Sequence, residues 1–420
     1  RADNADGSSW TASAQTLDET NHVGLHTSLA IVNGNPAISY YDTTIDNLKF
    51  IRASDASGTN WSCPVTLDAS AALGQYTSMA IVNGHPAIGY YDATNDDLKF
   101  IRASGNYTNL DFTVNDLGEA GDNNIGDGIC ATAGGVCTLR AALEEVNENL
   151  GVGSLSNPIN ITINQTGTIN LSSALPDIQE FVNLIGHSSG NTLKVTGTLG
   201  ADVLRIRNTT CDITVSVSNL IFEGGDQGGL EVNNANANIT NCVIQDVAGS
   251  NHQALRVLNG TVALDRCSFL NNTSNSHGGA LETETGGTVT ATNCTFSGNS
   301  NRGDDNVSRG GAVYLSHNTA ILNLINCTIV NNETGTGGGG GVNIHAGTLN
   351  LTNTVIANNT ENDGSTTTDN DLEFRDHANV TFGTNTTNLV ENCEDNGASE
   401  CDGGFTSMND PNLAVAATCG

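Results

Sequence analysis

The 420-residue sequence has little positive charge, few aromatic residues and almost no proline. It contains 14 Lys and Arg against 45 Asp and Glu, which gives a formal net charge of -31. This imbalance excludes recognition of nucleic acid or of an anionic membrane surface through charge. No apolar run approaches the roughly 20 residues that a membrane-spanning helix needs. We therefore expect neither a nucleic-acid partner nor a membrane span.

What the sequence does contain predicts an all-β fold. Hydrophobic residues make up 37% of the chain, so the composition is not that of a disordered protein. Charged residues are only 14%, which leaves Asn, Thr, Ser and 48 Gly to form much of the surface. The length predicts two or three domains, unless a repeat architecture extends one of them.

The eleven cysteines favour an oxidising compartment. Cys130 with Cys137, and Cys393 with Cys401, lie in Gly- and Asp-rich loops and are predicted to form short disulfides. The chain begins at Arg1 rather than Met, which we interpret as the start of a processed chain, although a fragment would begin the same way. We expect a secreted or cell-surface protein. Candidate N-glycosylation sequons lie at Asn60, Asn106, Asn164, Asn208, Asn306, Asn332 and Asn379.

The first quarter of the chain holds an internal repeat. Residues 24–54 and 74–104 are nearly the same sequence, and each copy predicts an antiparallel β-meander whose first two strands flank an Asn-Gly turn. We assign residues 1–109 to two tandem repeats, 10–60 and 61–109. Each resembles one propeller blade, and because two blades cannot close a ring, their open sides need covering. A small sandwich, the next domain or other subunits would do this. Four tyrosines form either a sugar-binding platform or cross-strand packing: Tyr40, Tyr41, Tyr90 and Tyr91.

Residues 110–152 predict a cap region with a disulfide loop and an amphipathic helix. Thr138 is a candidate N-cap, and Gly151 follows as a stop. Four apolar residues form one helical stripe: Leu139, Ala142, Leu143 and Val146. Glu144, Glu145 and Glu148 are expected to face water. Such a helix would cover the open end of a stack of strands.

The polar loop before this helix is a candidate metal site. Asp122, Asn124 and Asp127 offer oxygen ligands at roughly calcium-loop spacing, without the bidentate Glu of an EF-hand. The alternative is an ordinary Asx-rich turn. We expect no cofactor apart from this candidate structural calcium.

Residues 153–420 predict a parallel β-helix followed by a C-terminal disulfide loop. Apolar pairs recur every 22 to 33 residues, with Gly and Asn between them, so that three short strands form each turn of about 25 residues. Two inward columns are predicted. One is a ladder of cysteines, Cys242, Cys267, Cys294 and Cys327, which would either pack as small buried hydrophobic side chains or form disulfides between neighbouring coils. The other is an amide ladder, Asn272, Asn299, Asn332 and Asn359.

The junction carries a family resemblance. The segment from Phe112 to Asn147 resembles the CSLREA-type domain, whose Cys-Ser-Leu-Arg-Glu-Ala motif stands here as Cys137-Thr138-Leu139-Arg140-Ala141-Ala142. This domain is found at the start of secreted bacterial right-handed parallel β-helices with polymorphic outer-membrane-protein-like repeats. The resemblance covers roughly residues 110–410. It implies that fold, with an N-terminal capping α-helix, and implies little about activity.

One outward row of the predicted coils could carry chemistry. Its positions are Glu231, Arg256, Glu282, Tyr314 and Asn343, and the next outward row has Glu284, Ser316 and His345. A groove there would bind a sugar chain, and a hydrolase would need two carboxylates close together. The long insertion nearby adds Asp304 and Asp305. The alternative is a solvated face with a weak chain of ion pairs.

The sequence favours a structural role over an enzymatic one. We expect an extracellular cell-surface protein that self-associates into a homo-oligomer, filament or matrix, because unclosed repeats leave strand edges that other copies could cover. The alternative is a carbohydrate-binding adhesin, or a polysaccharide lyase or hydrolase, that uses the β-helix groove.

Overall fold

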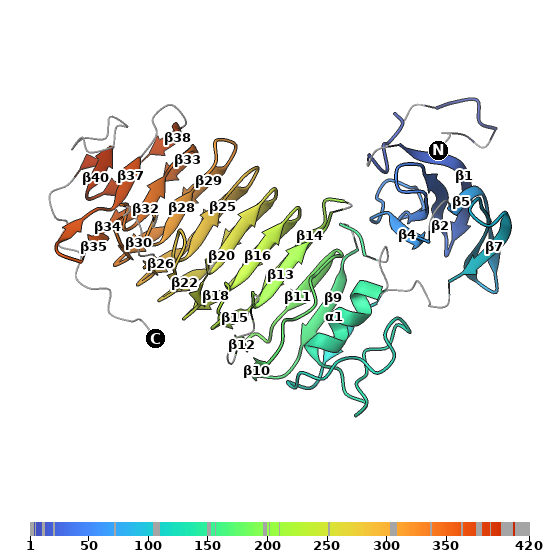
Figure 1. Cartoon of the computed structure of the whole chain (residues 1–420), viewed down its shortest axis with the longest axis horizontal. Coiled ribbons are helices and arrows are strands. Elements are labelled where there is room, and N and C mark those ends of the chain that lie inside the picture. The colour runs from blue at the N-terminus through green and yellow to red at the C-terminus, as the bar shows by residue number, and fades with distance from the viewer. Residues whose placement is uncertain are drawn as a thin grey trace.

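The computed structural model shows a long stack of β-strands with a smaller β module beside one end (Figure 1). It describes the chain apart from residues 1–3, 5, 11–12, 20–21, 71–72, 104–109, 149–152, 156, 196–199, 201, 210, 251–252, 303–308, 337, 363, 375–379, 387, 396–405 and 408–420. Strands dominate the described residues, and α1 (Leu139–Glu148) is the one α-helix among them. No helix in the described part is long and apolar enough to cross a membrane.

Two antiparallel sheets form the N-terminal module. The first has the order β1 (Val23–Val32), β2 (Asn35–Asp42), β3 (Asn47–Arg52), β4 (Val65–Asp68). The second has the order β5 (Leu73–Val82), β6 (His85–Asp92), β7 (Asp97–Arg102). Asn33 and Asn83 adopt positive φ values of 47° and 52° at the two tight turns, a conformation that Asn tolerates better than most residues. The Asn-Gly hairpins are therefore where the sequence places them.

A buried polar cluster stabilises the first repeat. The Lys49 ammonium lies 2.9 Å from Asp18 and 3.4 Å from Asp42. The Tyr40 hydroxyl donates to Asp18 at 2.7 Å. Charges this deeply buried need partners of this kind, because an unpaired one would carry a large desolvation penalty.

The second repeat reproduces this cluster 50 residues later. Lys99 lies 3.4 Å from both Asp68 and Asp92, and Tyr90 donates to Asp68 at 2.6 Å. Because Tyr40, Tyr41 and Tyr90 are buried, the sugar-binding platform is wrong, and the tyrosines take part in packing and internal hydrogen bonds.

The rest of the chain winds through three long sheets of parallel strands, as a parallel β-helix does. Sheet 1 consists of β8 (Phe112–Val114), β9 (Ile159–Ile163), β11 (Val182–Ile185), β14 (Thr214–Ser218), β17 (Asn236–Thr240), β21 (Thr261–Asp265), β25 (Thr288–Thr292), β29 (Ile321–Ile325), β33 (Gly347–Thr352) and β38 (Val380–Thr386). Sheet 2 consists of β10 (Gly167–Leu171), β12 (Asn191–Val195), β15 (Leu220–Glu223), β18 (Val243–Gln245), β22 (Ser268–Leu270), β26 (Thr295–Ser297), β30 (Thr328–Val330), β34 (Val355–Ala357), β39 (Leu389–Val390) and β41 (Thr406–Ser407). Sheet 3 consists of β13 (Leu204–Arg207), β16 (Leu230–Asn233), β20 (Leu255–Leu258), β24 (Leu281–Thr283), β28 (Val313–Leu315), β32 (Val342–Ile344), β37 (Leu372–Phe374) and β40 (Cys393–Asp395).

A fourth, narrower sheet lies between sheets 2 and 3 along the chain. It consists of β19 (Ala248–Gly249), β23 (Thr273–Ser274), β27 (Ser300–Asn301), β31 (Glu333–Thr334), β35 (Thr360–Asn362) and β36 (Thr367–Asp369). Its strands pair in parallel except for β36, which is antiparallel to β35. Apart from β36, the strands of these sheets pair with the strand one coil away, so equivalent side chains stack.

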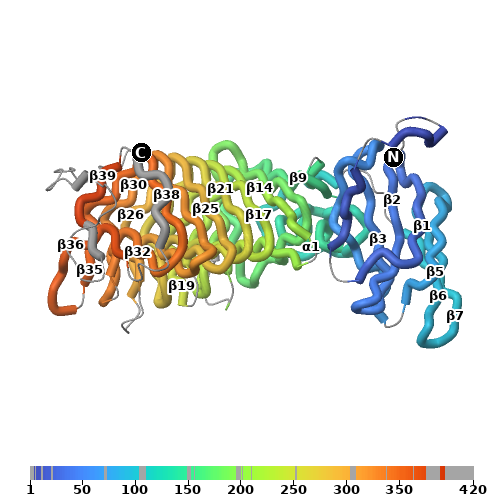
Figure 2. Tube along the Cα trace, turned by 90° about the horizontal axis from the view of Figure 1, so that it is seen from above, coloured from blue at the N-terminus to red at the C-terminus, as the bar shows by residue number. Residues whose placement is uncertain are grey.

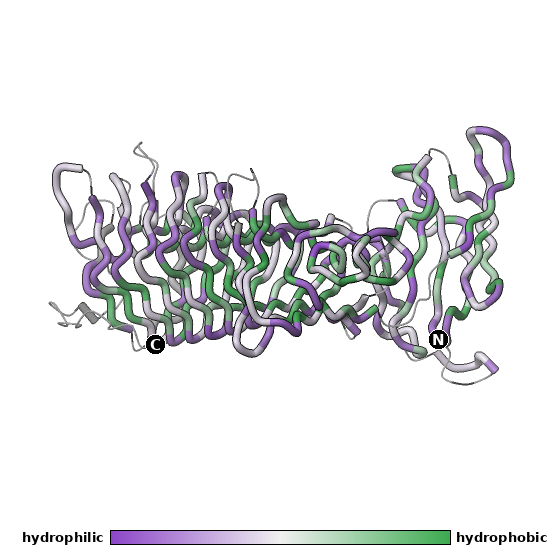
Figure 3. The backbone as a smooth tube through the Cα atoms, turned by 90° about the horizontal axis from the view of Figure 1, so that it is seen from below, coloured by the Kyte–Doolittle hydropathy of each residue, from purple (hydrophilic) through white to green (hydrophobic). Residues whose placement is uncertain are grey.

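This stacking produces columns of like residues. Hydrophobic positions recur from one coil to the next (Figure 3). Phe269 and Phe296 pair in register and their rings stack, with centroids 4.7 Å apart and planes 7° from parallel. One continuous hydrophobic core runs from α1 through the coils.

The amide column is a chain of buried hydrogen bonds. The Asn272 Nδ2 donates to Asn299 Oδ1 at 2.9 Å, Asn299 donates to Asn332 at 2.9 Å, and Asn332 donates to Asn359 at 2.8 Å. The same Nδ2 atoms also donate to backbone carbonyls such as that of Phe269, at 3.0 Å. The ladder therefore satisfies backbone carbonyl groups at a corner of the coils.

The helix α1 lies against the first strands of sheet 1, as seen from above in Figure 2. Its apolar stripe is buried, and Thr138 Oγ1 accepts a hydrogen bond from the backbone N–H of Ala141 at 3.1 Å, as an N-cap does. Arg140 ties the helix to the chain around it, with Glu119 at 2.7 Å and the Ala174 carbonyl at 2.6 Å.

The expectation that Glu145 faces water is wrong. Its side chain is fully buried and accepts hydrogen bonds from the backbone N–H groups of Gly126 and Gly128, both at 2.8 Å. The polar loop folds back onto the helix, and its free amides need an acceptor. Burial raises the pKa of this carboxyl group.

Candidate functional site

The two repeats of the N-terminal module pack face to face. Leu48 and Phe50 of β3 form one hydrophobic cluster with Leu73 and Met79 of β5. Gly74 permits the approach: a Cβ atom there would lie 2.6 Å from Leu48 Cα, and its φ of +97° also favours glycine. Polar contacts fix the register, because the Met79 N–H donates to Ser28 Oγ at 2.9 Å.

Each repeat uses only one of its two surfaces in this contact, and the remaining surface of each is open at an outer side of the module. In the second repeat Leu98 is 86% exposed and Phe100 66%, whereas their counterparts Leu48 and Phe50 are 0% and 4% exposed. We call Leu98 and Phe100 the β7 face.

The first repeat exposes the surface whose counterpart in the second repeat is buried in the internal contact. Leu29 is 65% exposed, whereas its counterpart Met79 is 8% exposed. No described part of the chain lies within 4 Å of a Cβ placed on Gly24, although its counterpart Gly74 is covered by Leu48. We call Gly24 and Leu29 the β1 face. The module thus presents the two halves of its own internal contact on opposite sides.

A second candidate site lies on the outer face of sheet 3. The outward side chains Glu231, Glu282, Tyr314 and Asn343 are buried, so the prediction of a solvated face is wrong for this row. Loops between the sheets fold back over it. The Glu373 carboxylate, for example, lies where a Cβ on Gly338 would be. Loops of this kind carry no period in the sequence, so the pattern could not predict the cover.

Arg256 forms ion pairs with two of the three glutamates around it. Arg256 Nε lies 2.7 Å from Glu284 Oε1, and Arg256 Nη1 lies 3.5 Å from Glu231 Oε2. Burial and the nearby charge of Glu284 together raise the pKa of Glu282 to about 8, although Arg256 and Gln253 act in the opposite direction. Glu282 therefore favours its protonated form at neutral pH, whereas Glu284 is ion-paired with Arg256.

Aromatic and basic groups complete the row. The His277 ring stacks on Tyr314, with centroids 4.7 Å apart. Arg309 Nη1 donates to the Tyr314 hydroxyl at 3.2 Å and lies 3.2 Å from His345 Nδ1. The sequence did not connect His277 with this row, because it lies in a loop outside the strand pattern. Asp304 and Asp305 lie outside the described residues.

The loop predicted to bind calcium is held by its own hydrogen bonds. Asp122 accepts from the N–H groups of Asn124 and Ala131, both at 2.7 Å, and Asn124 Nδ2 donates to Asp127 at 2.9 Å. No group of three His, Cys, Asp or Glu side chains converges among the described residues as a metal site would. A calcium ion on Asp122, Asn124 and Asp127 stays a prediction, which a chelator titration tests.

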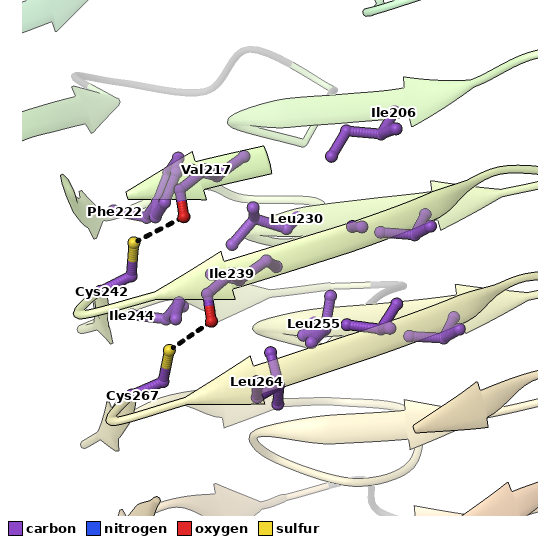
Figure 4. Packing of buried hydrophobic residues seen from close by; sticks show 14 of the residues in the cluster. Ile206, Val217, Phe222, Leu230, Ile239, Cys242, Ile244, Leu255, Leu264 and Cys267 are labelled. Carbon is purple, nitrogen blue, oxygen red and sulfur yellow. Dashed lines mark hydrogen bonds between the residues drawn. The ribbon is translucent and has the colours of Figure 1, made fainter. Parts of the chain in front are cut away.

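The cysteine ladder is buried. Cys242, Cys267, Cys294 and Cys327 are free thiols, each placed before an in-register strand of sheet 2. Cys242 Sγ donates to the Val217 carbonyl at 3.8 Å and Cys267 Sγ to that of Ile239 at 3.3 Å (Figure 4). Burial raises the pKa of Cys242 to about 11, which keeps its thiol protonated and unreactive.

Two disulfides join described cysteines. Cys130 and Cys137 form the short loop expected from the sequence, and Cys63 bonds Cys211, 148 residues away. The second bond links the N-terminal module to the β-helix. No sequence pattern predicts it, because neither cysteine has a close partner along the chain. Cys401, the predicted partner of Cys393, lies outside the described residues.

The predicted glycosylation sites differ in access. Asn60 and Asn164 are exposed, and Asn208 is half-buried. Asn332 is buried in the amide ladder, so its prediction as a glycan acceptor is wrong for the folded protein. Asn106, Asn306 and Asn379 lie outside the described residues.

No protein-family model matches this chain, and no curated protein or solved structure is significantly similar to it. Any functional conclusion therefore depends on the geometry above.

Proposed function

We propose that this protein is an extracellular structural component that self-associates head to tail, the β7 face of one copy packing on the β1 face of the next. The observation that carries the proposal is the difference in exposure between Leu98 and Leu48, which occupy the same position in two nearly identical repeats. An apolar surface that is buried in one repeat and open in the next needs a cover.

The contact inside the module serves as the template. In it, Leu48 covers Gly74 and packs in one cluster with Met79. In the contact between copies, Leu98 would cover Gly24 and approach Leu29, with the same backbone geometry on both sides. This explains why the occupant is a second copy of this chain and not an unrelated protein: the complementary surface already exists on it.

The two faces differ, so the contact is heterologous. Heterologous contacts either close into a ring or continue as a filament. A propeller-like ring holds about four to eight blades, which corresponds to about two to four chains with two repeats each. A definite small oligomer would therefore indicate a ring, and unlimited growth would indicate a filament.

The net charge of -31 opposes this association. Because the two faces are apolar and the repulsion is electrostatic, salt screens the repulsion without weakening the contact. Association is expected to strengthen as the ionic strength rises from about 0.01 M to about 0.15 M.

A mixing experiment tests the head-to-tail geometry. The variant Leu98→Asp/Phe100→Asp blocks the β7 face, and Leu29→Asp blocks the β1 face. Each variant alone should be monomeric, and an equimolar mixture should form dimers and nothing larger, because one intact pair of faces remains. Mixtures that stay monomeric while the wild type associates would overturn the head-to-tail arrangement.

The extracellular setting and the cap region belong to the same proposal. Two disulfides support an oxidising compartment. The Cys130–Cys137 bond directly before α1, and the contacts of Arg140 with the first coil, support a capping region of the CSLREA type. Deletion of this capping region should leave the first strands of the β-helix exposed.

A second candidate function is cleavage of a polysaccharide on the outer face of sheet 3. The observation that favours it is the pair Glu282 and Glu284, of which one is protonated and the other ion-paired, as the acid and its partner are in glycoside hydrolysis. Glu282 would give its proton to the glycosidic oxygen, and the Glu284 carboxylate would take a proton from the water that adds at the anomeric carbon.

Release of reducing ends from a panel of polysaccharides tests this candidate. Glu282→Gln and Glu284→Gln should each abolish the release, and Glu333→Gln, an exposed residue on the neighbouring narrow sheet, should not. Equal activity in all three variants would contradict the role of the pair.

A further inference from the structure

Three adjoining cavities surround the Cys63–Cys211 disulfide, where the N-terminal module meets the β-helix. Their volumes are about 600, 390 and 280 Å³. The two larger ones share Cys63, and the two smaller ones share Asn208 and Thr209. Together they form one cleft, and clefts at domain junctions are common places for ligands.

The largest cavity has a mixed lining. Trp61, Leu155 and Phe181 supply apolar surface. Short uncharged hydrogen-bonding side chains supply most of the rest: Gln15, Thr16, Thr59, Asn60 and Ser62. Its charged residues are acidic, Glu19 and Asp212, with no Lys or Arg among the described residues that line it. The adjoining cavity of about 390 Å³ adds Asp177, Glu180 and Arg207, so acidic residues outnumber basic ones in the described lining of both.

This lining selects the chemistry of a ligand. An aromatic ring beside many hydroxyl and amide groups suits a sugar, which has apolar ring faces and hydroxyl edges. The acidic residues disfavour anionic ligands such as uronic acids or phosphates. A volume of about 600 Å³ is within the range of small-ligand sites and fits a few sugar units.

The chain contains its own comparison for Trp61. Trp10 occupies the corresponding place at the start of the first repeat. Each indole N–H donates to the carbonyl of the glycine three residues earlier, Gly7 at 2.9 Å and Gly58 at 3.0 Å. The local turns are the same, yet Trp10 is exposed, while Trp61 lines the cleft.

We propose that the junction cleft binds a neutral oligosaccharide, with Trp61 as the stacking surface. The disulfide fixes the two walls relative to each other, so the site is formed before the ligand arrives and little ordering is needed on binding. The site is separate from the β7 and β1 faces, and it adjoins β13, the first strand of sheet 3, whose Arg207 lines the cavity of about 390 Å³.

Tryptophan fluorescence tests the proposal directly, because the chain has only two tryptophans. In Trp10→Phe the remaining fluorophore is Trp61, and in Trp61→Phe it is Trp10. Protein from a host that does not glycosylate is titrated with neutral hexasaccharides of β-glucan, xylan and mannan, and with oligogalacturonate as the anionic control. We expect a saturable change for at least one neutral hexasaccharide in Trp10→Phe, and no change in Trp61→Phe.

Calorimetry with that hexasaccharide adds the energetic test. Trp61→Ala should weaken binding about tenfold or more, and Trp10→Ala should leave it unchanged. Leu155→Arg, on an exposed wall residue, should also weaken binding, which keeps the test decisive if Trp61→Ala does not fold. Absence of saturation with every neutral hexasaccharide, or equal changes in both single-tryptophan proteins, would overturn the proposal. Preference for oligogalacturonate would do so as well.

Discussion

Leu48 and Leu98 occupy the same position in two nearly identical repeats, yet the first has no exposed surface and the second is 86% exposed. The difference arises because the first repeat is covered by β5 of the second, and no described segment of the chain covers the second in turn. The repeated sequence therefore encodes a contact that one copy of the chain uses only once.

The amide ladder is expected to stabilise the β-helix strongly. In Asn299→Ala the buried N–H of Asn272 loses its acceptor at 3.1 Å, and the Phe269 carbonyl loses its donor. The variant should lose about 2–3 kcal/mol of unfolding free energy, measured by chemical denaturation.

The matched control for the ladder is Asn323→Thr. Asn323 points outward from sheet 1 and is half-buried; it donates to Thr290 Oγ1 at 2.9 Å and accepts from Asn350 Nδ2 at 2.7 Å. This change should alter stability by less than about 0.5 kcal/mol. Equal losses in the two variants would show that the inward position of Asn299 has no special role.

The Cys63–Cys211 disulfide is expected to hold the N-terminal module in place. It closes a loop of 148 residues, so Cys63→Ser/Cys211→Ser should lose about 2–4 kcal/mol of stability. Small-angle scattering should also show a larger radius of gyration for the variant. By contrast, removal of the short-range disulfide in Cys130→Ser/Cys137→Ser should leave the radius of gyration as it is in the wild type.

The stability of the protein should depend on the protonation of Glu282. Its folded pKa of about 8 lies above the ordinary value of 4.5, so the folded state keeps a proton that the unfolded chain loses between these pH values. The contribution of this group to stability is fully present below about pH 4.5 and is lost as pH rises through 8.

Glu282→Gln removes this dependence, because the amide stays neutral. The variant should be more stable than the wild type at pH 9 and closely similar at pH 4, which thermal denaturation across this range measures. A difference between the two proteins that does not change with pH would contradict the raised pKa.

Expression in a glycosylating host should distinguish the sequons. Asn60 and Asn164 are exposed and should carry glycans, whereas Asn332 should not if folding precedes modification. Mass spectrometry of tryptic peptides measures the occupancy of each site. A glycan on Asn332 in the folded protein would contradict the amide ladder.

Much of the fold could be predicted because it is periodic. The inward residues of stacked coils repeat every turn, so Cys242, Cys267, Asn272 and Asn299 could be placed in columns from spacing alone. The turns at Asn33 and Asn83 could be placed because two-residue hairpins demand particular residues.

The sites could be predicted only in part, because they depend on contacts without a period. The repeat pattern predicts the outward row that contains Glu282, but the burial of this row depends on loops that fold back over sheet 3. The cleft at Trp61 depends on the bond between Cys63 and Cys211, which no local pattern signals. The periodic pattern of the sequence cannot predict irregular loops or disulfides between distant residues.

Sedimentation velocity of the wild type and of Leu98→Asp/Phe100→Asp, over a range of concentrations at about 0.15 M salt, tests self-association most directly. The wild type should shift to larger species as concentration rises, and the variant should sediment as a monomer throughout. A wild-type protein that remains monomeric at the highest concentration, or a variant that associates equally well, would contradict the assembly through these two faces.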